Sequence, residues 1–336
     1  MILCRFSKIL TVLFWVFTIV LWGQKTTFSF GSCHKMDKPI SDVILNTIAV
    51  EKPDGFIWLG DIVYGDDGNP KDLKTKFDRL SNKAAYKSLK QSTKVYGIWD
   101  DHDYGINDGG ADYINKSESR RELFSFLELP KDHRAYQREG AYQAYTIQAD
   151  KHHIKLILLD NRYFKTPYVK SKSNQQQYRK DRKGTLLGKA QWAWLEEQLK
   201  NSNARVHVFG CGIQLLSNKH RFEKWSNYPK ERKKMIRLLQ KYKVKNPVFL
   251  TGDRHMSELS LGNIGYTSLI DVTSSGMTEA LTYNLSEKNP YRISPTIGQN
   301  SYGQLIIDWE ESRISIVFKD SEGLPLYEYQ HDLMKN

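Results

Sequence analysis

The sequence predicts an α/β protein in which helices cover both faces of a largely parallel β-sheet. Short, nearly continuous apolar runs of strand length alternate with longer segments of helical periodicity, as in sheets that are buried on both sides. Each of the apolar runs in the first three quarters ends in a small polar or glycine-containing cluster. Because functional groups of such sheets gather beyond the carboxyl ends of the strands, we expect these clusters to meet at one site.

Six apolar runs carry this pattern, and they lie at residues 28–30, 56–59, 95–99, 154–159, 206–209 and 248–250. The clusters that follow them lie at residues 31–34, 60–64, 100–103, 160–162, 210–212 and 251–255. Helical periodicity is found at residues 71–90, 116–127, 188–200 and 229–241. Further strands with short turns are predicted at residues 269–272, 302–308, 314–318 and 326–329, and we expect them to form a second sheet packed on the first.

The composition is that of a folded globular protein. Of the 336 residues, 40% are hydrophobic and 12% aromatic, which suffices for a sizeable core. The 22 glycines and 10 prolines are too few for a collagen-like or low-complexity chain, and a mean hydropathy of -0.58 excludes a polytopic membrane protein. Three cysteines do not make a disulfide scaffold.

The first 24 residues have the pattern of a signal peptide. Arg5 and Lys8 precede an uncharged apolar run at residues 9–22, which is shorter than the roughly 20 residues that span a bilayer. An uncleaved membrane anchor is the alternative. We predict a signal peptide at 1–24 and one domain at 25–336, exported to the periplasm or secreted, with no stable membrane span after cleavage.

The formal net charge is +12, and it would be +10 without Arg5 and Lys8. Lysine-rich stretches at residues 170–189 and 230–245 carry much of this charge. They fit a solvated surface, or an electrostatic attraction of anionic substrates. Neither stretch has the regular aromatic residues of a single-strand nucleic-acid groove, so we infer no nucleic-acid partner. We expect a monomer.

The donor types that follow the strands suit a pair of metal ions. Such pairs are held by oxygen and nitrogen donors, with a carboxylate that bridges both ions. Asp61 and Tyr64 lie three residues apart in a turn after a strand, so both could reach one ion. A tyrosinate and the Cys33 thiolate suit ferric iron, whereas Asp100 and Asp101 suit a hard ion such as Ca²⁺, Mg²⁺ or Mn²⁺. Two unlike ions are therefore the natural hypothesis.

Several motifs in this order resemble the PhoD-like (alkaline phosphatase D) family of calcineurin-like metallophosphoesterases. Gly-Asp-x-x-Tyr at 60–64 is similar to an element of purple acid phosphatases, and Gly-Asp-Arg-His at 252–255 is similar to their Gly-His-x-His. The closer resemblance to the PhoD-like family rests on Phe-Gly-Ser-Cys at 30–33, Trp-Asp-Asp-His-Asp at 99–103, Leu-Asp-Asn-Arg at 159–162 and Thr-Ser-Ser-Gly-Met-Thr at 273–278. The motifs extend over about three quarters of the chain.

The resemblance implies a four-layer αββα sandwich, with two mixed β-sheets flanked by helices and an Fe³⁺ and Ca²⁺ centre at the strand ends. Mg²⁺, Mn²⁺ or Zn²⁺ are alternatives for the second ion. Carried over by motif, the metal ligands would be Cys33, Asp61, Tyr64 and His255 for iron and Asp61, Asp101 and Asp253 for calcium, with Asp100 beside them. His102 corresponds to the imidazole directed at the leaving group, and Arg162 and Arg254 would meet phosphate oxygens. Ser274 and Ser275 would either contact substrate or form a tight turn.

The function implied is an exported metal-dependent phosphoesterase that hydrolyses monoesters, diesters or both through a metal-activated hydroxide. One alternative is a phosphodiesterase or phospholipase-like enzyme, whose basic stretch at 170–189 docks lipid or polymer phosphates. The other is a catalytically inactive, metal-stabilised binding protein. Two of the assigned residues also have a structural alternative. Cys33 could form a disulfide with Cys211, and Arg162 could form an ion pair with Asp160.

Overall fold

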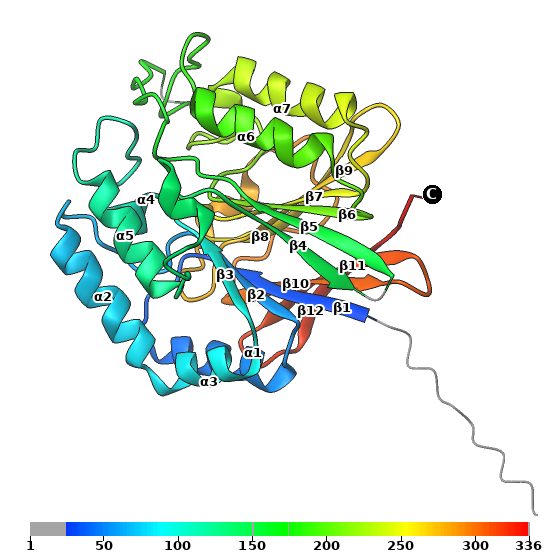
Figure 1. Ribbon diagram of the computed structural model, residues 1–336, viewed down its shortest axis with the longest axis horizontal. Helices are drawn as coiled ribbons and strands as arrows, with labels where there is room; N and C mark the ends of the chain where they lie inside the picture. Colours follow the sequence, from blue (N-terminus) through cyan, green and yellow to red (C-terminus); the bar gives the residue numbers. More distant parts are fainter. Residues whose placement is uncertain (1–24, 150, 174, 335–336) are drawn as a thin grey trace, which may run out of the picture.

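Two β-sheets stack face to face between layers of helices in the computed structural model, which describes residues 25–149, 151–173 and 175–334 (Figure 1). The predicted four-layer αββα sandwich is confirmed. The predicted signal peptide at 1–24 lies outside the described residues. Within the ranges that are described, none of the helices is both long and apolar enough to cross a membrane.

The first sheet has six strands in the order β12-β11-β10-β1-β2-β3. The pairs β1–β2 and β2–β3 are parallel, and the other pairs are antiparallel. Its strands are β1 (Lys25–Gly31), β2 (Gly55–Leu59), β3 (Val95–Ile98), β10 (Ser301–Asp308), β11 (Arg313–Asp320) and β12 (Pro325–Asp332).

The second sheet also has six strands, in the order β4-β5-β6-β7-β9-β8. The four central strands are parallel and both edges are antiparallel. Its strands are β4 (Gln143–Ala149), β5 (His152–Leu158), β6 (Val206–Cys211), β7 (Pro247–Thr251), β8 (Ser257–Asn263) and β9 (Ser268–Ser274).

Alternation along the strands divides the core into two apolar layers. On β5, Leu156 and Leu158 pack in the cluster between the two sheets, whereas Ile157 packs in the cluster under α6 (Gly188–Lys200) and α7 (Pro229–Lys241). Because successive side chains of a strand point to opposite faces, both faces of this sheet need helices or a second sheet to cover them. The other outer layer consists of α1 (Pro39–Glu51), α2 (Pro70–Asn82), α3 (Ala84–Ser92) and α5 (Lys116–Phe126).

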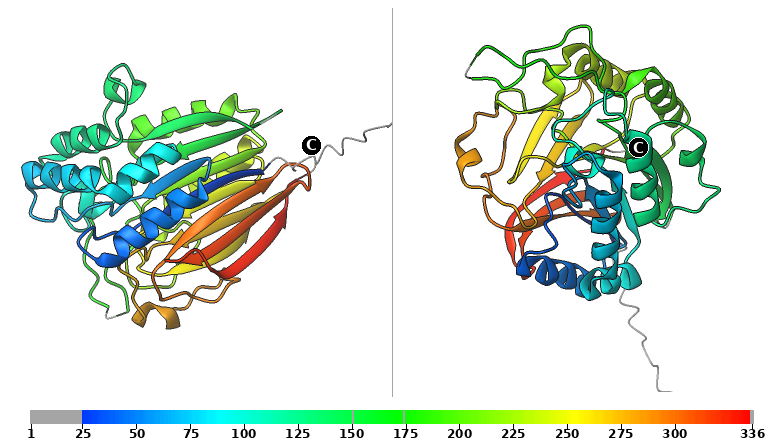
Figure 2. Two further views of the ribbon diagram at one scale, coloured as in Figure 1. Left: turned by 90° about the horizontal axis from the view of Figure 1, so that it is seen from below. Right: turned by 90° about the vertical axis from the view of Figure 1, so that its left-hand side faces the viewer.

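Two predictions of the sequence analysis need correction. The periodic segment 71–90 is two helices, α2 and α3, because Lys83 between them is extended, with φ −65° and ψ 137°. The late strands do not form a separate sheet either. Strand β10 pairs antiparallel with β1 and so extends the first sheet, while β9 pairs with β7 in the second (Figure 2).

The start of α6 is held to α7 by one buried carboxylate. Oε2 of Glu231 accepts hydrogen bonds from the backbone N–H groups of Leu186 and Leu187, at 2.8 and 3.1 Å. It also accepts from the Thr185 hydroxyl and from Nε1 of Trp192, each at 2.9 Å. These four donors would lose this acceptor if the carboxylate were removed, and buried donors without partners are costly.

We therefore expect Glu231→Ala to lower the free energy of unfolding by about 2–4 kcal/mol, since several buried donors lose a charged acceptor. Urea unfolding followed by circular dichroism measures this change. The control is Glu197→Ala on the exposed side of α6, which should change stability by less than about 0.5 kcal/mol. Equal stability of the two variants would contradict the structural role of Glu231.

Candidate metal centre

The loops after several strands of both sheets meet at one edge of the sandwich. The loop after β1 is bonded to the loop after β2 through the His34 N–H and the Asp61 carbonyl, at 2.9 Å. The loops after β6 and β7 are joined through the Gly252 N–H and the Gly212 carbonyl, at 2.8 Å. The convergence that the sequence pattern predicts is therefore present in the structure.

Cys33 lies at the centre of this group. Its thiol donates a hydrogen bond to Oδ2 of Asp61 at 3.2 Å and lies 3.2 Å from the Ser275 hydroxyl. The same hydroxyl accepts from the backbone N–H of His255 at 2.9 Å. Three predicted metal ligands from three separate loops are thus linked through one sulfur and one serine.

Four predicted ligands have left-handed backbone conformations. Their φ angles are 54° for Cys33, 50° for Asp61, 67° for Asp253 and 55° for His255. Residues other than glycine pay roughly 1–3 kcal/mol for such conformations, which persist where the surroundings impose them and which cluster at functional sites. Other non-glycine residues of the described chain share this conformation, but four of them gathered in neighbouring loops fit a functional site.

The imidazole of His255 is oriented by the backbone of a neighbouring loop. Its Nδ1 lies 2.6 Å from the carbonyl oxygen of Glu279, so Nδ1 carries the proton and donates. The lone pair then belongs to Nε2, as in histidines that bind metals through one nitrogen and a carbonyl through the other. The Glu279 carboxylate is held by Lys35 at 3.0 Å and Lys38 at 2.5 Å.

The buried acids of this group resist ionisation when no cation is present. Burial raises the pKa of Asp61 well above its usual range, and the adjacent Cys33 adds to that rise. Burial likewise raises the pKa of Asp253 to about 7 and raises the pKa of Cys33 and of the Tyr64 phenol. A bound cation would favour all four ionised forms.

Two carboxylate oxygens in this cluster are unused by the protein. Oδ1 of Asp61 and Oδ2 of Asp253 are buried and have no hydrogen-bond partner among the residues described. Buried polar atoms normally have partners, so these oxygens are available to a ligand. The thiol, phenol, imidazole and carboxylates together fit a metal pair that includes a hard or ferric ion.

The fourth loop supplies Asp101 and His102 from the short helix α4 (Asp101–Tyr104). Donor atoms of Asp61, Asp101 and His102 lie within 4.8 Å of one another, which is metal-binding spacing. Oδ2 of Asp101 accepts from the Asp108 N–H at 2.8 Å. Burial raises the pKa of Asp101, but the positive charges of Arg162 and His102 and the hydrogen bond from Asp108 together outweigh burial and lower that pKa to about 2.

His102 is held between a carboxylate and an aromatic ring. Its Nδ1 lies 2.5 Å from Oδ1 of Asp66, and its ring centre is 4.3 Å from that of Tyr64. Burial lowers the pKa of His102, but the hydrogen bond to Asp66 and the charges of Asp61 and Asp101 outweigh burial and raise it to about 11. The imidazole is therefore held in its protonated form.

Asp100 reaches the site because two glycines leave room for it. A Cβ atom at Gly60 would lie 2.3 Å from the Asp100 Cβ, and one at Gly212 would lie 2.1 Å from its Oδ1. Oδ1 accepts from Nε of Arg162 at 2.6 Å, and Oδ2 has no partner within the described part of the chain. Asp100 therefore pairs with Arg162 through one oxygen, and metal ligation by the other stays a prediction.

Arg162 is completely buried and forms ion pairs on two sides. Besides Asp100, its Nη2 lies 2.6 Å from Oε1 of Glu223, and its Nη1 donates to Oε2 at 2.9 Å. Asp160 is not its side-chain partner, because that carboxylate accepts from Nε1 of Trp99 at 2.9 Å and from the Ala141 N–H at 2.7 Å. A phosphate contact by Arg162 stays a prediction.

The remaining predicted residues lie close to the cluster. Arg254 is buried, pairs with Glu287 and lies 4.7 Å from the centre of the Phe222 ring. Ser274 and Ser275 are both fully buried, and the Ser275 contacts described above are with predicted metal ligands. Substrate contacts by these three residues stay predictions.

The two cysteines among the described residues, Cys33 and Cys211, are separate. Cys33 and Cys211 are both buried and free, so the disulfide alternative does not hold. Cys211 lies in the apolar layer under α6 and α7, and its thiol donates to the Ile213 carbonyl at 3.4 Å.

A second acidic group was missed by the sequence analysis. Donor atoms of Asp101, Asp108 and Glu223 also lie within 4.8 Å of one another, and the buried Lys165 amine lies 3.9 Å from Glu223. Asp108 and Glu223 follow no strand and belong to no motif, so nothing local distinguished them. Only the fold of their loops brings them to the site.

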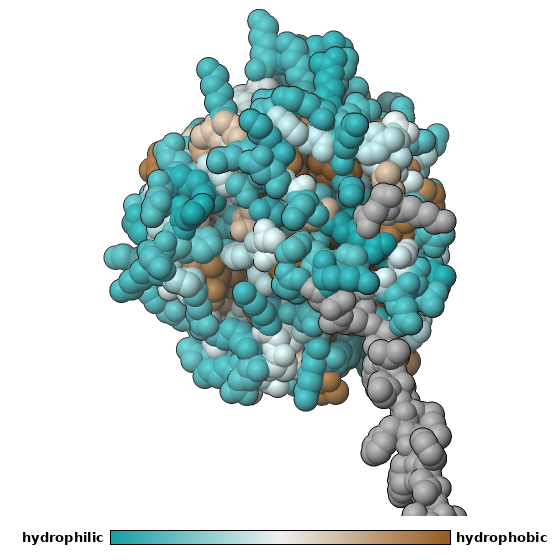
Figure 3. All heavy atoms as spheres, turned by 45° about the vertical axis from the view of Figure 1, so that its right-hand side comes forward, coloured by the Kyte–Doolittle hydropathy of each residue, from teal (hydrophilic) through white to brown (hydrophobic). Residues whose placement is uncertain are grey.

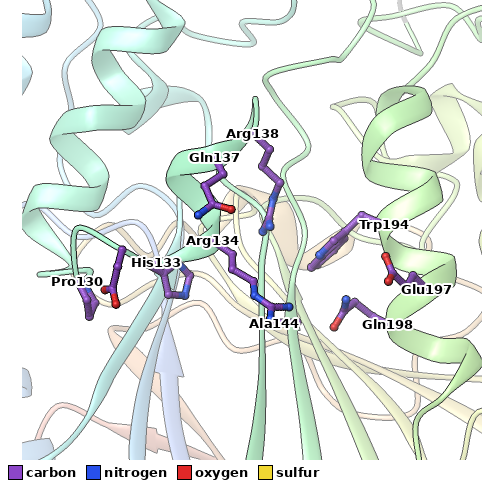
Figure 4. Close-up of a pocket in the computed structure, with 10 residues that line it drawn as sticks. Pro130, His133, Arg134, Gln137, Arg138, Ala144, Trp194, Glu197 and Gln198 are labelled. Atoms are coloured by element: carbon purple, nitrogen blue, oxygen red, sulfur yellow. The ribbon is translucent and has the colours of Figure 1, made fainter.

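A separate cleft of about 640 Å³ contains none of the predicted site residues. Its walls are the segment around η1 (Arg134–Gln137) and α6, and Ala144 of β4 lies between them. Arg138 and Trp194 face one another across it, with the guanidinium 5.2 Å from the indole ring (Figure 4). Size alone therefore does not identify the functional site here.

Two stacked mixed sheets, flanked by helices and carrying donor groups after the strands, can be compared with known proteins. Residues 151–316 match the family model of PhoD-like phosphatase. The chain is 25% identical to alkaline phosphatase D of Bacillus subtilis (strain 168) over 280 residues, which cover 69% of this chain and 46% of that protein. The predicted resemblance to the PhoD-like family is confirmed.

Solved structures show the same fold. "Structure of PhoD" aligns with a TM-score of 0.71 at 17% identity, covering 92% of this chain and 68% of that one. A structure titled "GAP50 the anchor in the inner membrane complex of Plasmodium" aligns with a TM-score of 0.58 at 13% identity. The alignment covers 93% of this chain and 90% of that one. The chain spans less than half the length of its curated Bacillus relative.

We expect Arg162→Met to lower the free energy of unfolding by about 3–5 kcal/mol, because Asp100 and Glu223 would be left as buried, unpaired charges. Thermal and urea unfolding measure the loss. The control is Arg121→Met, which breaks an exposed pair with Glu118 and should cost less than about 1 kcal/mol. If Arg162→Met were as stable as the parent and only bound phosphate less well, the guanidinium would serve the substrate rather than the fold.

Proposed function

We propose that this protein is an exported, metal-dependent phosphoesterase of the PhoD-like kind, acting on phosphate monoesters, diesters or both. The observation that carries the proposal is the buried group of Cys33, Asp61, Tyr64, Asp253 and His255, whose acids have raised pKa values and whose free oxygens suit cations. The match to PhoD-like phosphatases supports the same class. Residues 1–24 are its proposed export signal.

The donor set divides between two ions. Cys33, Asp61, Tyr64 and His255 would hold Fe³⁺, and Asp61, Asp101 and Asp253 would hold Ca²⁺ or another hard divalent ion. When bound, such a pair neutralises the phosphate charge and makes a water acidic enough to supply hydroxide near neutral pH. We assign Asp100 chiefly to neutralising Arg162, because their contact is 2.6 Å and fully buried.

His102 is the proposed general acid. Asp66 binds its Nδ1 and keeps the imidazole protonated, so Nε2 carries a proton that can pass to the departing oxygen. Arg254 directly follows the predicted ligand Asp253, and we propose that its buried positive charge stabilises the charge that develops on the phosphate oxygens. Burial of both groups strengthens these electrostatic effects.

Asp61→Asn should lower kcat/KM for a nitrophenyl phosphate ester by at least about a hundredfold, because the proposed bridging carboxylate is lost. Iron and calcium content, measured on the same sample by atomic emission, should fall as well. Asp37→Asn, an exposed acid that pairs with Arg79 on the surface, is the control and should leave both values unchanged. A folded Asp61→Asn protein with full activity would refute the proposed centre.

The substrate class follows from one comparison on the parent enzyme. Hydrolysis of a monoester and a diester with the same leaving group is measured after loading with iron and calcium. Preference for one ester assigns the enzyme to that reaction. Bound metal without hydrolysis of either ester would instead favour the inactive binding protein.

His102→Ala should reduce hydrolysis of alkyl phosphates by about a hundredfold or more, because an alkoxide needs a proton to leave. Hydrolysis of nitrophenyl phosphate should fall much less, since nitrophenolate leaves without one. Asp66→Asn should give the same selectivity to a smaller degree, because it removes only the group that positions the imidazole. Equal losses on both substrates would exclude His102 as the general acid.

A further inference from the structure

A cavity of about 380 Å³ opens beside the candidate metal centre, between the loops at residues 106–114 and 167–178. Ile106, Tyr113, Ile114, Pro167 and Tyr168 supply most of its apolar wall. None of these residues belongs to a motif of the sequence analysis or has a part in the proposed chemistry. The cavity is therefore a separate feature of the same edge of the sandwich.

The cavity is attached directly to the proposed ligands. Asp108, one of its lining residues, donates its N–H to Oδ2 of Asp101 at 2.8 Å. The Asp108 carboxylate accepts from the Tyr178 hydroxyl and from Nε2 of Gln177 at 3.3 Å. A phosphoester bound at Asp101 would therefore lie next to the cavity.

Hydrogen bonds keep the two loops together, so the cavity is preformed. The Ala111 N–H donates to the Lys165 carbonyl, and the Lys165 amine donates to the Asp108 carbonyl, both at 2.8 Å. Tyr168 and Tyr178 stack with ring centres 4.3 Å apart. A preformed wall binds a ligand without an added cost of ordering loops.

Large apolar side chains are exposed on these loops. Ile106 is 41% exposed, Ile114 86% and Val169 44%, and two of the three line the cavity. The face in Figure 3 is mostly hydrophilic, with apolar residues in scattered patches. Apolar side chains gathered at a cavity beside a catalytic centre indicate a ligand with an apolar part.

We propose that this cavity binds the apolar substituent on the leaving oxygen of a phosphoester substrate, which makes the enzyme selective for alkyl or aryl esters. This inference rests on the proposed function. The Asp112 carboxylate lies in the wall and would repel a second anionic group, and the rest of the wall is largely apolar, so we expect an uncharged substituent.

The test uses n-alkyl phosphates from ethyl to octyl, together with the matching methyl diesters. Their leaving alcohols have nearly equal acidity, so differences in kcat/KM report binding of the chain and not intrinsic reactivity. We expect kcat/KM to rise about two- to fourfold for each methylene until the cavity is filled. A flat series would overturn the assignment.

The variant Ile106→Asn with Ile114→Asn should flatten the series, because both apolar side chains of the cavity wall become polar. Both side chains are exposed, so the fold should be retained, and a melting curve checks this. The matched control is Leu324→Asn, which is 60% exposed in the turn before β12 and should keep the chain-length dependence. Equal slopes in both variants would overturn the proposal.

Calorimetric binding of octylphosphonate and methylphosphonate tests the cavity without turnover. Tighter binding of the octyl compound that is lost in the double variant supports an apolar cavity. This result would stand even if no ester were hydrolysed, and the proposed function alone would then fail. Equal affinities would refute the cavity assignment and leave the proposed function standing. Faster hydrolysis of choline phosphate than of butyl phosphate would also refute the cavity assignment. It would mean that the wall with Asp108 and Asp112 binds a cationic substituent and not an apolar one.

Discussion

The structure depends most on the buried ion network of Asp100, Arg162 and Glu223. Asp100 follows β3 in the first sheet, Arg162 follows β5 in the second, and Glu223 comes from the loop after β6. Their contacts of 2.5–2.9 Å therefore join both sheets at the edge where the proposed ligands lie. Burying the Arg162 guanidinium costs free energy unless carboxylates neutralise its charge. The two buried carboxylates likewise depend on the guanidinium to neutralise theirs.

The same network separates two kinds of acid. Asp100 and Glu223 form buried ion pairs with Arg162, whereas no ion pair within the described residues holds Asp61 or Asp253, and each of these two has a buried oxygen without a hydrogen-bond partner there. Burial raises the pKa of Asp61 and Asp253, so a bound cation would favour their ionised forms. The left-handed backbone at both residues is a cost that the surrounding loops impose. Carboxylates that pair with Arg162 and carboxylates proposed to bind metal thus lie side by side, and the ion pairs distinguish them.

The edge of the sandwich also combines rigid and variable parts. The proposed ligands lie on short turns directly after buried strands, which fixes them within the core. The cavity beside them is built by the longer loops around residues 106–114 and 167–178, held by a few hydrogen bonds between Lys165, Asp108 and Ala111. The proposed catalytic groups therefore depend on the short turns, and the proposed substrate selectivity depends on the longer loops. Short turns constrain the positions of side chains more tightly than long loops do.

The sequence by itself indicated most strands and helices, because burial on both faces leaves continuous apolar runs, but it missed β4, β8 and α1. The clusters that hold Cys33, Asp61, Tyr64, Asp101, His102, Asp253 and His255 were located from the ends of these runs, and their proposed roles came from the resemblance of the motifs. Only the tertiary structure decided that β10 joins β1, that Arg162 is enclosed by Asp100 and Glu223, and that Asp108 and Lys165 flank the site. These pairings join residues far apart in the chain, and their energies come from burial and charge that no local pattern records.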